Sequence, residues 1–446
     1  MKTKLPTALK GCRKIGLVGL GVSNSGVLEH LKKCDECPEI RIRTKKNEDI
    51  KEDYLSDIDE DALVLSPSVR PDLAPIQEAR ARGVRILSDC ELFFTDTRAR
   101  CFAVTGSDGK STTTAMLSVL LSEAMGTSIP AVGNIGRALT PLLSESAPAY
   151  AIELSSFQLF HYAPRCERAV VTNLSENHLN WHKDMREYAS TKARLYENCE
   201  RPAVSIDDIG SLPLLKRTPF SVYSLEKSEK EIAKCKAEFA YYIKNDTVFQ
   251  NGAPFLPLSY LKADSRHNRY NLLAALALCA GLLTKEQARA IEGFSPLSHR
   301  CERVGEVRGV TFLDSSIDSS PARTSSTLAT LSAPVILLLG GMGKGLSPAP
   351  LLSAVTKKCR AVIAFGPFGK EAAAYLSANG YPGILSTADR LSDAFSSALD
   401  CARPGDTVLL SPGATSFDEF ENFAARGEAF RRLVKSIQTL QGKELP

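Results

Sequence analysis

The sequence lacks several features that would place the protein at a membrane, on nucleic acid or around zinc. It contains no apolar run of membrane-spanning length, and the N-terminal segment Leu5–Leu9 is too short and too proline-interrupted for a secretory signal. The 55 basic and 51 acidic residues leave a formal charge of only +4. The one close cysteine pair, Cys34 and Cys37, has no second pair or histidine cluster with which to complete a zinc site. We therefore expect a cytoplasmic protein with reduced thiols that binds neither nucleic acid nor membrane.

The chain does have a repeated alternation of short apolar strands and helical segments over its 446 residues. Such repeats build parallel sheets covered by helices, and the length favours about three domains. We predict an α/β protein with an N-terminal Rossmann-like domain (1–94), a central P-loop ATPase-like parallel sheet (95–297) and a C-terminal Rossmann-like domain (298–446). The expected strands are Lys14–Leu20, Ile40–Arg43, Ala62–Leu65, Val84–Leu87, Tyr150–Leu154, Ala169–Thr172, Val310–Leu313, Val335–Leu339, Ala361–Phe365 and Thr407–Leu410, with an apolar helix at Asn271–Leu283.

The most informative segment is Phe102–Thr113, where the apolar run Cys101–Val104 ends in a small-residue turn and a helix follows. Backbone N–H groups in such a turn, with a helix N-terminus behind them, bind anions. Lys110 would reach the β- and γ-phosphates of a nucleotide, and the Ser111 hydroxyl would ligate Mg²⁺. The strict pattern has a glycine where this chain has Val104, so a chance turn is the alternative. The loop residues expected to contact ATP are Gly106, Ser107, Asp108, Gly109, Lys110, Ser111, Thr112 and Thr113.

Two further polar sites follow strands of the same block, and ligands gather at that edge of a parallel sheet. Glu153 ends an apolar run, where a carboxylate is costly to bury unless a cation such as nucleotide-bound Mg²⁺ meets it. A capped or salt-bridged glutamate is the alternative. His178 and His182 follow the strand that ends at Thr172, and each either ligates metal, orients phosphate or is simply hydrogen-bonded.

Lys192 is unusual because it falls on the apolar side of an expected helix. It lies four residues after Tyr188 and three before Leu195, within a stripe of apolar residues at helical spacing. A snorkelling side chain, whose stem packs while its amine reaches water, is one explanation. A functional lysine is the other, and the pattern does not decide between them.

Other turns at strand ends are candidate binding surfaces. The turn Gly19–Asn24 resembles a dinucleotide-binding fingerprint, but Asn24 stands where the third glycine is expected. Arg300 lies at an expected domain junction, where a cation would meet nucleotide phosphates. The segments Gly340–Lys344 and Ser411–Phe420 also follow expected strands.

Together these motifs resemble the Mur ligase family, in collinear order along essentially the whole chain. The most specific are Glu153–Gln158 and Ser416–Gly427, which are similar to the D-glutamate-adding member of the family. The other matching segments are Thr105–Thr112, Gly133–Gly136, His178 with Lys192, His267–Asn271, His299 with Arg300, Gly340–Gly341 with Lys344, and Leu410–Pro412.

The resemblance implies an ATP-dependent amide ligase that adds D-glutamate to UDP-N-acetylmuramoyl-L-alanine through an acyl phosphate, in peptidoglycan precursor synthesis. It implies Lys110, His178 and Lys192 as catalytic residues, with Lys192 carbamylated, and ATP with two Mg²⁺ ions as cofactors. The first domain would bind the UDP-sugar, the second ATP and the third the amino acid, in a protein that we expect to be a monomer. Beyond the phosphate loop, the implied residues are Asn268, Asn271, Arg300 and Asp314 for ATP; Ser111, Glu153, His178 and Lys192 for metal; Gly19, Gly21, Ser23, Ser66 and Asn134 for the UDP-sugar; and Lys344, Ser416 and Phe423 for D-glutamate.

Several positions depart from the family pattern. Asn177 and Asn180 replace aspartates on either side of the histidine, which changes the support available to a metal ligand. Ser68 stands where the family often has a glycine. In the segment that follows the strand at Val310, Ser316 replaces the family's lysine and Ser315 replaces its aspartate. Asp314 takes the place of the asparagine that precedes that aspartate, and we assign the nucleotide contact to it.

Three alternatives remain for the function. Another Mur-type ligase or a folate-polyglutamate ligase would share the central loop but lack the pattern Ser416–Gly427. A P-loop nucleotide-binding protein without ligase activity would leave the first and third domains unexplained. A dinucleotide-dependent oxidoreductase would depend on the turn at Gly19 alone.

Overall fold

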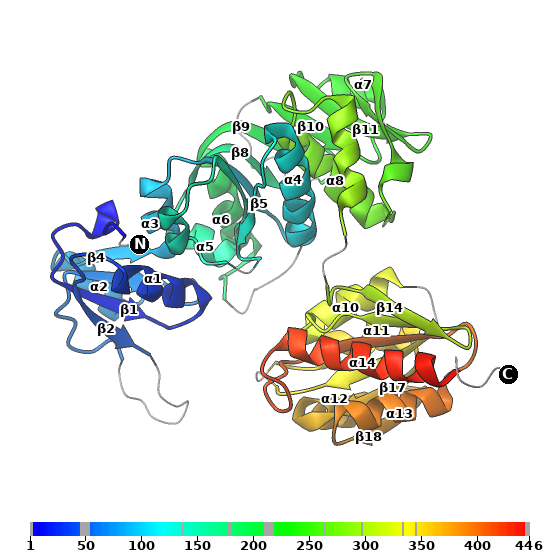
Figure 1. Cartoon of the computed structure of the whole chain (residues 1–446). Coiled ribbons are helices and arrows are strands. Elements are labelled where there is room, and N and C mark those ends of the chain that lie inside the picture. Colours follow the sequence, from blue (N-terminus) through cyan, green and yellow to red (C-terminus); the bar gives the residue numbers. More distant parts are fainter. Residues whose placement is uncertain are drawn as a thin grey trace. The chain divides into compact units, whose positions relative to one another are not determined.

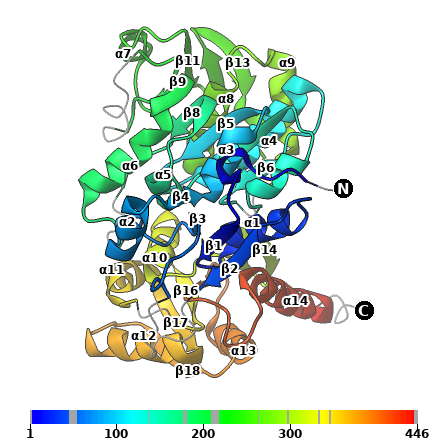
Figure 2. The same ribbon diagram turned by 90° about the vertical axis from the view of Figure 1, so that its left-hand side faces the viewer.

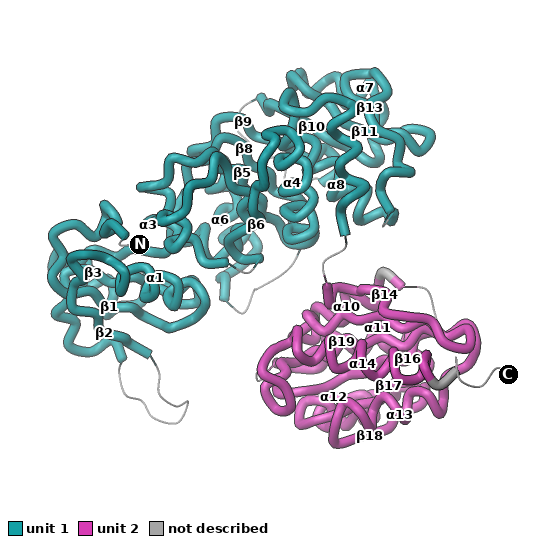
Figure 3. Tube along the Cα trace, viewed as in Figure 1, with its two compact units in different colours: residues 1–295 teal, residues 296–446 magenta. Residues whose placement is uncertain are grey.

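The computed structural model describes residues 3–44, 54–135, 137–175, 181–208, 218–262, 264–295, 298–331, 334–343 and 346–441. The chain forms two compact units, residues 1–295 and 296–446, which are distinguished by colour in Figure 3. Within the described ranges, unit 1 contains two sheets and unit 2 contains one.

The first sheet of unit 1 has four parallel strands in the order β2-β1-β3-β4. Alternate residues of its strands pack into two apolar clusters, one on each face, so the strands read as continuous apolar runs. Helices α1 and α3 contribute to one cluster and α2 to the other, and Figure 2 shows α1 and α2 on opposite sides of the sheet. The elements are η1 (Thr7–Leu9), β1 (Lys14–Val18), α1 (Val22–Lys32), β2 (Glu39–Arg43), β3 (Ala62–Leu65), α2 (Ala74–Ala81), β4 (Arg85–Ser88) and α3 (Asp89–Asp96).

The second sheet of unit 1 has nine strands in the order β13-β12-β11-β10-β9-β8-β5-β7-β6 (Figure 1). The strands from β11 to β6 are parallel, whereas β12 and β13 pair antiparallel at one edge. The strands are β5 (Arg100–Thr105), β6 (Ala131–Gly133), β7 (Ala149–Glu153), β8 (Arg165–Val171), β9 (Asn198–Ser205), β10 (Ser221–Ser224), β11 (Phe239–Lys244), β12 (Thr247–Gln250) and β13 (Ala253–Pro257).

Helices cover both faces of this sheet. Helices α4 and α8 share the larger apolar cluster, and α6 packs into the cluster on the opposite face. The apolar helix expected at Asn271–Leu283 is α8, which begins earlier because Ser265 caps it by accepting from the Asn268 N–H. It also ends earlier, at Leu278, before Gly281 with its left-handed φ of 72°. The helices are α4 (Lys110–Met125), η2 (Thr140–Ser144), α5 (Ser156–His161), α6 (Met185–Glu197), α7 (Glu229–Ala233), η4 (Leu258–Tyr260), α8 (Arg266–Leu278), α9 (Lys285–Ala288) and η5 (Arg289–Gly293).

Unit 2 is a six-stranded sheet in the order β14-β15-β19-β16-β17-β18, parallel except for the edge pair β14 and β15. Helices α13 and α14 share one apolar cluster and α10, α11 and α12 share the other. The elements are β14 (Glu302–Val307), β15 (Val310–Asp314), α10 (Pro321–Thr330), β16 (Val335–Gly340), η6 (Ala349–Leu351), α11 (Leu352–Lys358), β17 (Cys359–Phe365), α12 (Gly366–Ala378), β18 (Ile384–Ala388), α13 (Leu391–Cys401), β19 (Thr407–Gly413) and α14 (Phe423–Gln441).

Parallel sheets with helices on both faces confirm the predicted α/β class. The strand order also shows where ligands can gather, because neighbouring loops diverge where the chain reverses direction across a sheet. Such points lie between β1 and β3 in the first sheet and beside β5 in the second.

None of the described helices combines the length and apolarity needed to cross a bilayer.

Arg168 of β8 is a buried cation in the centre of unit 1, with 1% of its surface exposed. Its Nη1 donates to the carbonyl oxygens of Leu278 and Ala280, at 3.0 and 2.5 Å, where α8 ends. The last carbonyls of a helix have no partner within the helix, and a cation is favoured there. The guanidinium also lies 5.1 Å from the ring centre of Phe220.

We expect Arg168→Met to lower the free energy of unfolding of unit 1 by about 2 kcal/mol, because charge-assisted hydrogen bonds to two carbonyls are lost. Arg201→Met is the matched control, since exposed Arg201 lies 5.2 Å from the same Phe220 ring. That control should stay within about 0.5 kcal/mol of the wild type. Urea unfolding followed by fluorescence of Trp181, the single tryptophan, measures both. Equal effects of the two substitutions would refute the role of the carbonyl contacts.

Candidate functional site

The predicted phosphate loop connects β5 to α4, as expected. Gly109 precedes the helix with a left-handed φ of 76°, and Lys110 is the first helical residue. The Lys110 ammonium folds back over the loop and donates to the Ser107 carbonyl oxygen at 2.7 Å. The first N–H groups of α4 and the positive end of its dipole point into the same space, so the loop is built to bind an anion.

Close packing leaves no room for a side chain at Gly106. A Cβ atom there would lie 1.9 Å from Thr172 Oγ1, and the residue has a φ of 150°. The loop is also tied to the end of β8 because Thr172 donates to the Asp108 carbonyl oxygen at 2.7 Å and Asn173 accepts from the Asp108 N–H at 2.9 Å. These contacts hold the loop against the end of β8.

Glu153 ends β7, the strand beside β5, and only 1% of its surface is exposed. Its Oε1 accepts from Asn134 Nδ2 at 2.7 Å, whereas Oε2 is buried without a hydrogen-bond partner among the described residues. A buried carboxylate oxygen without a partner is costly and is satisfied by a cation. Magnesium prefers such hard oxygen ligands, and the Ser111 hydroxyl at the start of α4 is of the same type. The residues present therefore fit Mg²⁺.

Lys192 of α6 is buried, with 1% exposure, and its Nζ donates to the Gly106 carbonyl oxygen at 2.8 Å and to Thr105 Oγ1 at 3.3 Å. The amine also lies 4.7 Å from the ring centre of Tyr188. Because a snorkelling amine would reach water, the burial excludes that explanation. Burial, reinforced by the nearby Lys110 charge, moves the pKa of Lys192 well below its usual range, so the amine loses its proton at lower pH than an exposed lysine would.

Of the two histidines predicted in this region, the structure describes only His182. His178, together with Asn177 and Asn180, lies outside the described residues. His182 is buried, and its Nε2 lies 3.0 Å from Ser156 Oγ among the rings of Phe157, Trp181 and Tyr188. Burial lowers the pKa of His182, so it is a neutral packing residue of the aromatic cluster.

The loops predicted to hold the UDP-sugar come together at the reversal point of the first sheet. Cβ atoms built on Gly19 and Gly21 would lie 2.9 Å from Ser66 Cβ and 3.6 Å from Ser66 Oγ, respectively. Asn24, which replaces the third fingerprint glycine, is fully buried and donates to the carbonyl oxygens of Gly19 (2.8 Å) and Val64 (3.0 Å). The amide therefore locks the two loops together.

Ser23 and Asn134, the remaining residues predicted for the UDP-sugar, lie near a groove. Ser23 is half-buried in the first turn of α1, and exposed Asn134 links its own turn to Glu153. A groove of about 860 Å³ extends from Gly21 along α1 to η2 and is also lined by Arg137. The first sheet thus has an extended groove beside Gly21, one of the residues predicted to bind the UDP-sugar.

Asn271 of α8 lies against the phosphate loop, as a contact to ATP requires. It is 6% exposed, and its Oδ1 accepts from Thr113 Oγ1 at 3.3 Å. A Cβ atom on Gly109 would lie 2.3 Å from the same Oδ1. Asn268 is one helical turn earlier, with its Oδ1 3.5 Å from Asn271 Nδ2. Both asparagines therefore stand beside the loop.

In unit 2, Asp314 ends β15 and is fully buried. Its Oδ2 accepts from His299 Nδ1 at 2.6 Å, and Oδ1 accepts from the Ser316 N–H at 2.9 Å. Burial raises the pKa of Asp314, and the histidine opposes that shift. The nucleotide contacts expected of Asp314 and of half-buried Arg300 stay predictions, and Lys344 lies outside the described residues.

Two of the residues predicted to line the D-glutamate pocket, Ser416 and Phe423, lie within the described ranges. Ser416 is buried in the loop after β19, and Phe423 is 41% exposed at the first position of the helix. Their contact with an amino acid stays a prediction. One turn after Phe423, the structure shows a buried residue to which the sequence interpretation gave no role, Arg426.

Arg426 is fully buried and joins two loops of unit 2, those that follow β15 and β19. Its guanidinium donates to the carbonyl oxygens of Ser316 (3.0 Å), Ala414 (3.1 Å) and Thr415 (3.0 Å). Burial lowers the pKa of Arg426 to about 10. The signal was present in the sequence, because Arg426 has helical spacing with Phe423 and Phe430 and so falls on the apolar side of α14.

We expect Gly106→Ala to weaken ADP binding roughly tenfold or more, because overpacking of this kind costs about 1–3 kcal/mol and displaces the loop. Gly126→Ala is the matched control, since Gly126 ends the same helix with a φ of 63° but nothing lies within 4 Å of its Cβ position. That control should cost about 1 kcal/mol of stability and leave ADP binding unchanged. Calorimetric titration with ADP checks this, and equal affinities of the two variants would contradict it.

Comparisons with known proteins cover the whole chain. The model of the Mur ligase middle domain matches residues 104–279, and that of the Mur ligase glutamate ligase domain matches residues 299–413. A protein of Clostridium kluyveri named UDP-N-acetylmuramoylalanine--D-glutamate ligase is 34% identical over 96% of this chain and 97% of its own length. Proteins of the same name from Symbiobacterium thermophilum (95% of this chain, 98% of that protein) and Marinobacter nauticus (86% and 87%) are 32% and 35% identical.

Solved structures show that the fold is shared. UDP-N-acetylmuramate-alanine ligase from Thermotoga maritima is similar with a TM-score of 0.58 at 18% identity, over 96% of this chain and 99% of that one. A pseudomurein peptide ligase type C from Methanothermus fervidus gives a TM-score of 0.58 at 13% identity, over 95% and 100%.

Proposed function

Because the chain belongs to the Mur ligase family, we propose that it is an ATP-dependent ligase that joins D-glutamate to UDP-N-acetylmuramoyl-L-alanine in peptidoglycan precursor synthesis. The observation that carries the reaction type is the convergence of Lys110, Glu153 and Lys192 at the carboxyl ends of neighbouring strands. The choice of D-glutamate is supported by the segment Ser416–Gly427 and by the names of the relatives that match over nearly their full length.

The reaction requires three anionic substrates, ATP, the UDP-linked substrate and D-glutamate, to bind close together. The terminal carboxylate of the UDP-linked substrate attacks the γ-phosphate of ATP, which gives an acyl phosphate and releases ADP. The amine of D-glutamate then attacks the acyl carbon, and the tetrahedral intermediate collapses to the amide and phosphate. Lys110 and the N-terminus of α4 offset the phosphate charge, and the loop keeps the γ-phosphate in line with the carboxylate.

We propose that Ser111 and Glu153 hold one Mg²⁺ and that His178 and a carbamylated Lys192 hold a second, where the ions would offset phosphate charge. The carbamate forms when the neutral Nζ attacks carbon dioxide and releases one proton, which converts a cation into a carboxylate-like ligand. The burial of Lys192 against the Gly106 carbonyl supports this role, because a charged ammonium is disfavoured there.

The remaining assignments follow the position of each loop. We propose that the domain of residues 1–94 binds the UDP-sugar, that of 95–297 binds ATP and that of 298–446 binds D-glutamate, in a cytoplasmic monomer. The proposed contacts are Gly19, Gly21, Ser23, Ser66 and Asn134 for the UDP-sugar; residues 106–113, Asn268, Asn271, Arg300 and Asp314 for ATP; and Lys344, Ser416 and Phe423 for D-glutamate.

We expect phosphate release from ATP to require both UDP-N-acetylmuramoyl-L-alanine and D-glutamate. The measurement is a coupled phosphate assay with a panel of amino acids that includes L-glutamate, L-lysine and meso-diaminopimelate. Turnover with L-lysine or meso-diaminopimelate, and none with D-glutamate, would overturn the assignment.

We expect Lys192→Ala to lose most of the activity and to recover part of it when short carboxylates are added, because they can replace the carbamate oxygens. Lys183→Ala is the control, since Lys183 is exposed just before the same helix. It should keep near-normal activity. Near-normal turnover of Lys192→Ala, or a lack of response to added carboxylates, argues against the carbamate.

A further inference from the structure

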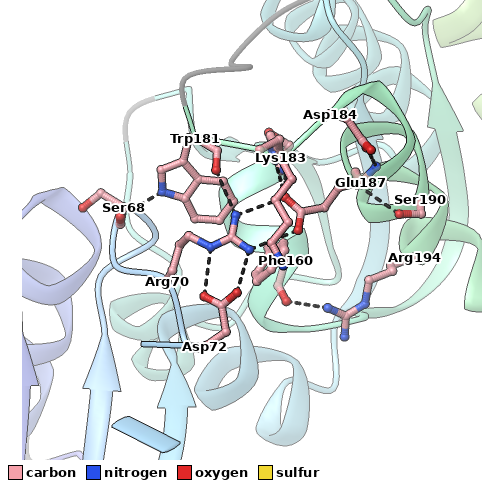
Figure 4. A network of polar contacts seen from close by, with 12 residues as sticks. Ser68, Arg70, Asp72, Phe160, Trp181, Lys183, Asp184, Glu187, Ser190 and Arg194 are labelled. Carbon is pink, nitrogen blue, oxygen red and sulfur yellow. Dashed lines mark hydrogen bonds and ion pairs between the residues drawn. The ribbon is translucent and has the colours of Figure 1, made fainter. Parts of the chain in front are cut away.

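One arginine, which the proposed mechanism does not use, holds the loop after β3 against the start of α6. Arg70 donates from Nη1 and Nη2 to the two carboxylate oxygens of Glu187, at 3.0 Å each (Figure 4). It also donates to both oxygens of Asp72, at 2.9 and 2.7 Å, and to the Trp181 carbonyl oxygen, at 2.8 Å. A single guanidinium thus joins the first sheet of unit 1 to the elements around the second.

Packing reinforces this contact. The guanidinium carbon lies 4.7 Å from the ring centre of Phe160 and 5.0 Å from that of Trp181, and the Trp181 indole N–H donates to the Ser68 carbonyl oxygen at 3.0 Å. The side chains of Arg70 and Glu187 are only 17% and 19% exposed. Bidentate pairs between a planar guanidinium and a carboxylate are directional, so they fix orientation as well as distance.

The Glu187 carboxylate stays charged at neutral pH, because the hydrogen bonds from Arg70 lower its pKa to about 2. The helix that carries Glu187 also contacts the phosphate loop. The next residue, Tyr188, has its hydroxyl 3.0 Å from Ser107 Oγ, and Lys192 lies further along the same helix with its amine on the Gly106 carbonyl. In the other direction, the loop that carries Arg70 begins at Ser66, where the turn after β1 approaches.

We propose that Arg70 is a positioning residue that sets the distance between the UDP-sugar loop and the phosphate loop, an inference that rests on the proposed function for the identity of the two ligands. By holding the first turn of α6, Arg70 keeps the substrate carboxylate and the γ-phosphate in register for attack. A misplacement of about 1 Å between reacting groups costs roughly 100-fold in rate. Arg70 acts through Glu187 and the helix, and contacts neither reacting atom.

We expect Arg70→Met to lower kcat roughly 10- to 100-fold while the KM for ATP changes little, because the phosphate loop itself stays intact. Arg194→Met is the matched control. Arg194 belongs to α6 and donates to the Phe160 carbonyl oxygen at 2.5 Å, in the same cluster but within the elements of the second sheet. Arg194→Met should keep a kcat close to that of the wild type. If Arg70→Met has the same kcat as Arg194→Met, the proposal is overturned.

A second measurement needs no turnover. Calorimetry gives the affinity for ADP with and without UDP-N-acetylmuramoyl-L-alanine, and we expect the UDP-linked substrate to raise it about fivefold or more in the wild type. The factor should fall towards one in Arg70→Met and Glu187→Gln and persist in Arg194→Met. Absence of coupling in the wild type, its persistence in Arg70→Met, or an equal loss in Arg194→Met each overturns the positioning role.

The two proposals fail in different ways. A wild type that shows Arg70-dependent coupling but no turnover with D-glutamate would refute the proposed function and leave the positioning role standing. Urea unfolding followed by Trp181 fluorescence identifies any variant that has lost its fold. If Arg70→Met is such a variant, Glu187→Gln decides, because it keeps the shape of the side chain and removes only the charge.

Discussion

The contact between Gly106 and the end of β8 is the constraint on which the site depends. Because no side chain fits between Gly106 and Thr172, the phosphate loop lies directly on the strand end, and its carbonyl faces the Lys192 amine. Glu153 arrives from β7 on the other side of β5. The ends of β5, β7 and β8, together with α6, therefore hold the predicted phosphate loop, a carboxylate and a lysine close together.

Four buried charges in this protein differ in what they touch. Arg168 and Arg426 are buried and donate to backbone carbonyl oxygens at the ends of a helix and of loops, so their charge stabilises the chain's own structure. Glu153 is buried with one oxygen left without a partner among the described residues, and Lys192 is buried against the phosphate loop. Since an unsatisfied buried carboxylate is costly, Glu153 is the group whose burial a ligand must explain.

The parts of the site that the sequence predicted well are those carried by one continuous segment. The phosphate loop and Glu153 end apolar strands and lie where predicted, because strand, turn and helix follow each other along the chain. Arg70 received no role because Trp181 and Glu187 are distant from it in sequence. Arg426 received none because its partners are backbone carbonyls, which no residue type signals, although its helical spacing indicates burial. The start of α8 was also missed, because Ser265 caps a polar first turn that precedes the apolar run.

By itself, the sequence determined the α/β class, the most apolar strands of each sheet and the strand, turn and helix of the predicted phosphate loop, since apolar periodicity and turn composition are local properties. It did not define the remaining strands, which include β6, β9 to β14 and β18. Only the tertiary structure decided between a snorkelling and a buried Lys192, because burial depends on what packs against both ends of the helix. It also placed His182 among aromatic rings, with its Nε2 3.0 Å from Ser156 Oγ. Charge and spacing indicate such residues as candidates for function, but segments far apart in the chain form the environment around them.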